Sequence, residues 1–186
     1  MVGVEVNSRD LKRVQRILKD VPGGSKRACV NASNRAFTRG KVVAKNEMKR
    51  RYTLKTRDVN QTLSIKKSTY ARLDGALYSR GPVSRLKQFK TYPANMPKRR
   101  PKVFKAEVIK GARKELPGVF LARMKSGHVG AYKRYSKKSL PIGEMPGPSI
   151  PYAIKSDKVS TKVQEEILKT FNARLNHEVD RLLDRL

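Results

Sequence analysis

Histidines and carboxylates, the side chains most often used for acid–base or metal chemistry, are few in this chain. The two histidines, His128 and His177, lie 49 positions apart, and neither has a second metal-binding side chain at ligand spacing. A two-carboxylate or two-metal site would have to be built from residues such as Asp58, Asp74 and Glu107. An enzyme would need a pocket in which two of four residues converge, namely these three acids and His128. No GxxxxGK[ST] phosphate loop and no GxSxG nucleophile motif occurs. We therefore predict that the protein is not an enzyme and uses no metal or other cofactor.

The single cysteine, Cys29, cannot form an intramolecular disulfide, and we predict that it is a small core residue. No apolar run reaches the roughly 18 residues of a membrane span. The N-terminus also lacks the charged and apolar regions of a signal peptide. We expect a protein that is not exported and does not contact a membrane.

Positive charge is the strongest signal in the composition. The 186 residues include 44 Lys and Arg against 15 Asp and Glu, a formal net charge of +29. Between residues 75 and 143, eighteen bases accompany two acids, whereas residues 156–186 hold six of each. Such a surface attracts either nucleic-acid phosphates or an acidic protein, and charge does not distinguish the two. The residues that we predict to face the anion are Arg123, Lys125, Lys133, Arg134, Lys137 and Lys138.

Helices are expected in the first third of the chain. Apolar spacing predicts a helix over Ser8–Asp20, a second over Ser25–Arg50, and a short third over Arg57–Thr62 that Thr56 caps. We expect a stripe of small residues on the second helix to let another element approach closely. This stripe consists of Ala28, Ala32 and Ala36, followed on the same line by Val43 and Glu47.

The apolar period then changes to two, which predicts strands. We expect strands within 63–65, 72–80 and 103–109, with a bend or bulge at Gly75. Val119–Met124 and Val129–Tyr135 form a hairpin that turns at Ser126 and Gly127. Residues 90–102, with three prolines, are expected to be a surface loop, and residues 110–117 a turn. The predicted fold class is α+β, with an antiparallel sheet of four to five strands packed against the N-terminal helices.

Four prolines within residues 136–155 predict an extended arm, because they remove amide donors and disfavour a helix or a central strand. The arm is too apolar for a flexible linker, so it packs either on its own domain or on a neighbouring chain. The residues that we predict to dock a partner are Leu140, Pro141, Ile142, Gly147, Pro148, Ser149, Ile150 and Pro151.

A long helix is expected over Asp157–Leu183, and at 1.5 Å per residue it is roughly 40 Å long. Its apolar stripe consists of Val163, Ile167, Phe171, Leu175, Val179, Leu182 and Leu186. The predicted organisation is one domain with four parts: a helical part over 1–62, a sheet over 63–135, the arm over 136–155 and the last helix over 156–186.

A string of motifs in the second half of the chain is more specific than any one of them alone. It consists of VFLARMKSGH at residues 119–128, Gly130 with Lys133 and Arg134, Leu-Pro-Ile at 140–142, and Gly-Pro-Ser-Ile-Pro at 147–151. Together with residues 63–67 and 81–89, this string resembles the phage minor tail protein Z family over about residues 59–153. The N-terminal helices are similar to that family mainly in pattern.

The resemblance implies a virion protein that completes the head-proximal end of a long phage tail and prepares it for joining to the filled head. It also implies an α+β fold, assembly into a ring of copies, and contacts with other tail and neck proteins. The basic surface would then face either DNA in the tail channel or an acidic tail protein. A non-specific nucleic-acid-binding protein, such as a ribosome-associated or packaging factor, is the alternative.

Overall fold

The structure, a computed structural model, describes residues 2–3, 12, 16–17, 22–99, 101 and 103–184. The chain forms two compact units. The first consists of Met1–Lys45, Leu63–Arg80 and Ile154–Leu186, and the second of Asn46–Thr62 and Gly81–Ala153. The assignment of the whole chain to one domain stays a prediction. The helix predicted over Ser8–Asp20 lies outside the described residues, apart from positions 12, 16 and 17, which are helical.

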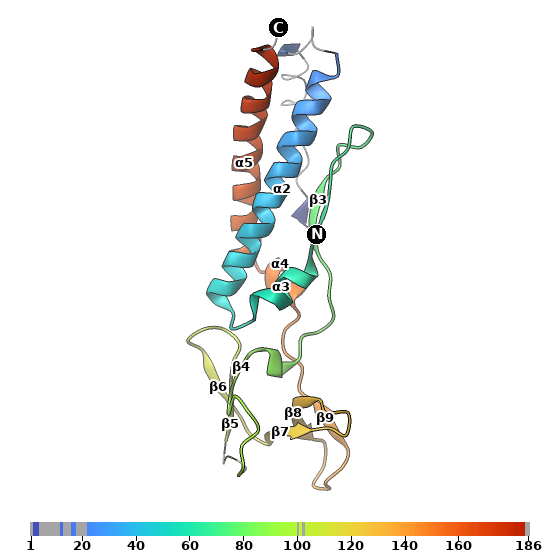
Figure 1. Ribbon diagram of the computed structural model, residues 1–186. Helices are drawn as coiled ribbons and strands as arrows, with labels where there is room; N and C mark the ends of the chain where they lie inside the picture. Colours follow the sequence, from blue (N-terminus) through green and yellow to red (C-terminus); the bar gives the residue numbers. More distant parts are fainter. Residues whose placement is uncertain are drawn as a thin grey trace. The chain divides into compact units, whose positions relative to one another are not determined.

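Two long helices dominate the first unit, α2 (Gly24–Arg51) and α5 (Asp157–Leu183). They run side by side in opposite directions (Figure 1), as two side-chain pairs show. Asn31 near the start of α2 donates to Glu178 near the end of α5, whereas Arg39 donates to Glu166. The bounds of α5 and its apolar stripe as far as Leu182 confirm the prediction, and Leu186 lies outside the described residues. The buried residues of α5 are Val159, Val163, Ile167, Phe171, Leu175, Val179 and Leu182.

The small-residue stripe of α2 is buried, as predicted, but its second half differs from the prediction. The stripe keeps a strict step of four residues instead of passing through Val43 and Glu47, which are partly exposed. A side-chain Cβ at Gly40 would overlap Cγ1 and Cδ1 of Ile167, so only glycine fits against α5 there. Cys29 is fully buried beside this line, as predicted. The stripe consists of Ala28, Ala32, Ala36, Gly40, Ala44 and Met48.

A small antiparallel sheet completes the first unit. Its strands are β1 (Val2–Gly3), β2 (Leu63–Lys66) and β3 (Ala76–Ser79), in the order β1-β3-β2. The amide of Asn34 on α2 holds the β2–β3 loop, because it accepts from the Ser68 N–H at 2.9 Å and donates to the Ser68 carbonyl at 3.0 Å.

The second unit contains two more three-stranded antiparallel sheets and two short helices. One sheet has the order β4-β5-β6 and the other β7-β8-β9. Leu86, Phe104, Ala106, Val119 and Ala131 form the core of this unit. The elements are α3 (Thr56–Thr62), η1 (Leu86–Gln88), β4 (Lys90–Tyr92), β5 (Phe104–Glu107), β6 (Arg113–Leu116), β7 (Val119–Arg123), β8 (Val129–Arg134) and β9 (Ile142–Glu144).

The described residues form three small sheets instead of the single sheet of four to five strands that the sequence predicts. Two strands lie where the sequence predicts a loop and a turn. Strand β4 has only three residues, and β6 lies at a sheet edge with three of its four residues exposed. Short exposed edge strands carry no apolar alternation, so the sequence gives no period-two signal for them.

The prediction that residues 136–155 form an extended arm without a helix is wrong for the second half of this segment. Helix α4 (Ile150–Lys155) begins within the proline-rich segment. Proline is compatible with the first turn of a helix because the amide that it lacks has no helical partner there. The side chain of Ser149 accepts from the Tyr152 N–H at 3.3 Å and so caps this turn. Strand β9 lies at the edge of its sheet, which agrees with the exclusion of a central strand.

Gly40→Val tests the close approach of α2 and α5. The valine side chain would overlap Ile167, so we expect the free energy of unfolding to fall by about 1–3 kcal/mol. Chemical denaturation of the full chain measures this change. Ala173→Val, at an exposed position of α5, is the matched control and should cost only a few tenths of a kcal/mol. If Ile167→Ala does not recover part of the loss in the Gly40→Val background, the two residues are not in the contact that we describe.

Candidate protein-docking site

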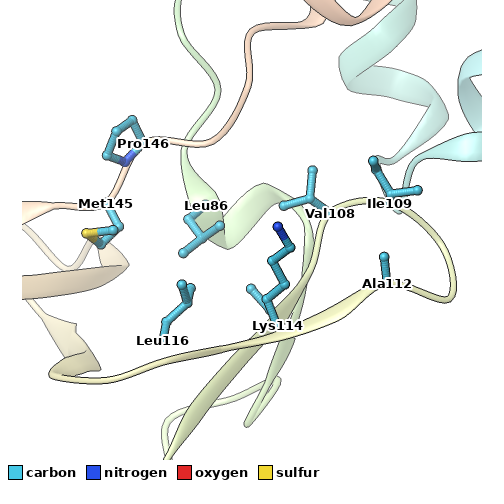
Figure 2. A pocket seen from close by; sticks show the side chains of 9 residues that line it. Leu86, Val108, Ile109, Ala112, Lys114, Leu116, Met145 and Pro146 are labelled. Atoms are coloured by element: carbon cyan, nitrogen blue, oxygen red, sulfur yellow. The ribbon is translucent and has the colours of Figure 1, made fainter.

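An apolar groove opens on the second unit between η1, strands β5 and β6, and the middle of the arm (Figure 2). Its volume is about 290 Å³. Such a groove has room for one or two apolar side chains of another chain. The lining residues are Leu86, Ala106, Val108, Ile109, Ala112, Lys114, Leu116, Met145 and Pro146.

One wall of the groove is the arm, which main-chain hydrogen bonds hold against its own unit. The Met145 N–H donates to the Ala131 carbonyl at 2.7 Å, and the Met145 carbonyl accepts from the Leu86 N–H at 3.0 Å. Two residues further on, the Gly147 N–H donates to the Ser84 carbonyl at 2.7 Å. These bonds continue the pairing of β9 and place Met145 and Pro146 beside Leu86.

The opposite wall is the β5–β6 turn, which the carboxylate of Glu107 shapes. One oxygen accepts from the Gly111 N–H at 2.9 Å, and the other accepts from the Tyr92 hydroxyl at 3.2 Å. The pKa of Glu107 is lowered, first by the hydrogen bond from Gly111 and then by the nearby charge of Lys90. The guanidinium of Arg113 lies 3.9 Å from the centre of the Tyr92 ring, which adds a cation–π contact to this wall.

One cationic side chain, Lys114, enters an otherwise apolar lining. Figure 2 shows its side chain rising from β6 between Leu116, Leu86 and Val108. Ile109 at the rim is 46% exposed, so apolar surface continues out of the groove. An apolar side chain next to a carboxylate would satisfy both the lining and the ammonium group.

His128 fixes the hairpin turn to the arm rather than serving as an isolated surface residue. Its Nε2 lies 2.8 Å from Oε1 of Glu144 on β9, and Nε of Arg85 lies 3.4 Å from Oε2 of the same carboxylate. Gly130 makes room for this contact, since a Cβ there would lie 2.7 Å from the Glu144 carboxylate and 2.9 Å from the Tyr132 ring. Burial raises the pKa of Tyr132, and the charge of Glu144 raises it further.

Three of the four residues that could form an acid–base or metal site have other partners in the structure, and the fourth, Asp58, lies in the first turn of α3. Asp74 pairs with Lys66 at 2.6 Å, Glu107 holds the β5–β6 turn, and His128 binds Glu144. His177 lies exposed on α5. Within the described parts of the chain, no three His, Cys, Asp or Glu side chains are grouped to hold a metal ion. The described helices also include none that is long and apolar enough to cross a membrane.

The six basic residues predicted to face an anion are all exposed, but they do not share one face of the β7-β8-β9 sheet. Arg123 and Lys133 belong to the face that includes Leu121 and Ala131, by the pairing of β7 with β8. Arg134 points to the opposite face, where its guanidinium lies 4.8 Å from the centre of the Phe120 ring. Lys125 lies in the hairpin turn, and Lys137 and Lys138 follow β8.

The predicted docking residues of the arm fall into an exposed tip and an anchored remainder. Leu140 is 67% exposed and Pro141 is exposed, whereas Ile142 belongs to the paired strand β9. Gly147 lies against the ring of Phe89, and Ile150 is buried. Of these predicted residues, those of the tip present the most apolar surface, next to Tyr135 at 75% exposure, and further along the arm Tyr152 is 74% exposed. Pro148, Ser149 and Pro151 are each partly exposed.

Sequence reasoning missed most of the groove. The alternation of residues 103–109 places Ala106 and Val108 on one face, which was a usable signal for one wall. Leu86, Ala112 and Met145 come from three separate segments, and no local pattern indicates that they meet. Arg85 and Glu144, which contact His128, also come from separate segments, so no local pattern indicates these contacts.

The fold defines a small protein of mixed helix and sheet, with an apolar groove on its second unit. The profile of one family, prophage minor tail protein Z (GPZ), matches residues 1–185. The chain belongs to this family and is a phage minor tail protein, which confirms the resemblance seen in the sequence. Neither the curated proteins nor the solved structures include a significant match. The family is a structural component of the tail and is typically not enzymatic.

Glu107→Gln tests the part of this carboxylate in the groove wall. Because the pKa of Glu107 is lower in the folded state, its charge stabilises the fold above the ordinary glutamate pKa of 4.5, and this stabilisation is lost as pH falls through the folded-state pKa. We expect stability of the wild type to fall more steeply below about pH 4.5 than that of Glu107→Gln. Urea unfolding at a series of pH values measures both curves, and parallel curves would contradict this assignment.

Proposed function

We propose that this protein completes the head-proximal end of a phage tail and joins it to the filled head through contacts with neighbouring tail and neck proteins. Membership of the minor tail protein family supports a structural role in the virion. The observation that carries the finer proposal is the groove of about 290 Å³, whose apolar lining surrounds one lysine. The chain has no described side chain that fills this space, so we assign it to a segment of a neighbouring tail protein.

The chemistry of the groove defines the segment that would bind there. An apolar side chain would displace water from Leu86, Val108 and Met145, and burial of apolar surface contributes about 25 cal/mol per Å². A carboxylate beside it would pair with Lys114. The residues around the groove are strongly basic, which favours an acidic partner and speeds its association.

The tip of the arm supplies a second contact in this proposal. Leu140 and Tyr135 expose apolar surface that their own unit leaves uncovered among the described residues. In a ring of identical copies, such a tip reaches the next copy, and the same contact repeats around the ring. The proposed partners are therefore copies of this chain together with other tail and neck proteins.

DNA in the tail channel remains the second candidate for the basic hairpin. The exposure of Arg123, Lys125 and Lys133 favours non-specific contact with phosphates, because no base-reading element accompanies them. Arg134 lies on the opposite face of the sheet from Arg123 and Lys133, which favours a surface that faces more than one neighbour.

Ala112→Arg tests the groove. The arginine would occupy the space with charge, so we expect joining of tails to heads to fall about tenfold, which corresponds to 1.4 kcal/mol of binding free energy. The assay mixes filled heads with tails lacking this protein and counts infectious particles after the purified variant is added. Ala94→Arg, at another exposed alanine of the same unit, is the control and should retain joining. Equal activity of the two variants would exclude the groove as a docking site.

Leu140→Asp tests the tip of the arm. A point substitution is suitable because deletion of the whole arm would also remove β9 and Met145 from the unit. The exposed leucine contributes little to the fold, so we expect unchanged thermal unfolding but a loss of head joining and of ring formation. Analytical ultracentrifugation and the joining assay measure the two effects. Val83→Asp, at a valine with 62% exposure, is the control, and equal losses in both variants would contradict a specific role for the tip.

A further inference from the structure

A second groove, separate from the docking site, lies on the first unit between α2 and α5. Its volume is about 360 Å³, and its lining is Arg35, Thr38, Arg39, Val42, Thr170 and Arg174. All three charged residues are arginines. Arg35 and Arg39 occupy successive turns of α2, and Arg174 comes from α5 across the groove, so the guanidinium groups surround one space from two elements.

Much of the hydrogen-bonding capacity of these arginines is unused within the described chain. Arg39 uses Nε to bind Glu166 at 3.0 Å, which leaves the N–H groups on its two Nη atoms outside this contact. No described carboxylate forms an ion pair with Arg35 or Arg174. Glu178, one turn beyond Arg174, binds Asn31 and Arg181 instead, at 3.1 and 2.6 Å.

The two threonines of the lining differ in whether their hydroxyl group can donate a hydrogen bond into the groove. Thr38 donates its proton to the Asn34 carbonyl at 2.8 Å, so it cannot also donate into the groove. Thr170 on α5 lines the same space and carries one further hydroxyl donor. The groove therefore offers several N–H donors, one hydroxyl donor and an excess of positive charge.

We infer that this groove binds a phosphodiester of a nucleic-acid backbone. The planar fork of arginine matches the two non-bridging oxygens of a phosphodiester, and three arginines around one space exceed what a single carboxylate would use. Helix α2 carries nine bases and one acid, so the positive charge continues along the helix beyond the groove. A polyanion fits such a row better than one acidic side chain does. Contacts of this kind position the backbone without reading the base sequence.

This inference goes beyond tail completion and does not depend on it. Its test therefore uses the purified full chain with duplex DNA of random sequence and requires no tails. The test variant Arg35→Gln/Arg174→Gln removes two groove cations. The control variant Arg27→Gln/Lys169→Gln removes two exposed cations from the same two helices outside the groove. Thermal unfolding checks that both variants remain folded.

We expect the slope of log affinity against log salt to become shallower by about 0.9 in the groove variant, because the groove holds one phosphate and each phosphate contact contributes about 0.9. Substitution should then lower affinity about 3.5-fold more at 50 mM salt than at 200 mM salt. The control variant should change the slope much less. Arg35→Lys/Arg174→Lys should retain the slope but lose affinity, because lysine keeps the charge without the fork.

Two results would overturn the inference. Equal changes in the groove and control variants would show that the charge acts diffusely and that no site exists. Loss of poly-glutamate binding in the groove variant, with duplex DNA binding retained, would show that the groove holds a carboxylate of a protein partner instead of a phosphate.

Discussion

The close approach of α2 and α5 is the constraint on which the first unit depends. A line of small residues at every fourth position of α2 leaves room for the bulky stripe of α5, and Gly40 allows Ile167 to lie against the helix backbone. Asn31 with Glu178 and Arg39 with Glu166 then fix the opposite directions of the two helices. The spacing also sets the width of the arginine groove, because its lining comes from both helices.

The second unit depends on a different kind of interaction, the attachment of the proline-rich arm through its own backbone. Prolines limit how many amides the arm can donate, and Met145 and Gly147 are two residues whose N–H groups still donate. These main-chain hydrogen bonds bring the arm beside Leu86 and form one wall of the apolar groove. The carboxylate of Glu144 also holds the arm in place, because it binds His128 in the hairpin turn. The arm is thus a structural wall over most of its length, with exposed apolar side chains at Leu140 and Tyr152.

The parts of the fold that the sequence predicts correctly are those with long local patterns. The apolar stripe of α5 and the hairpin around Gly127, whose φ of 82° requires a left-handed turn residue, each follow from residues close in the chain. Strand β6 was missed because its pairing with β5 leaves no apolar trace in its own residues. The groove could be predicted only in part, through Ala106 and Val108, because Met145 reaches it by long-range contacts. The arginine groove likewise joins residues of two helices that are far apart in the sequence.

The central claim is that this minor tail protein docks neighbouring virion proteins at the head-proximal end of the tail through the groove and the tip of the arm. Electron microscopy of an assembled tail, at a resolution that shows side chains, tests it most directly. If the proposal is correct, this chain lies at the head-proximal end of the tail. An apolar side chain of a neighbouring protein then lies beside Val108 and Met145, and Leu140 is covered. A chain located elsewhere along the tail, or one whose groove and arm tip remain open to solvent, would contradict it.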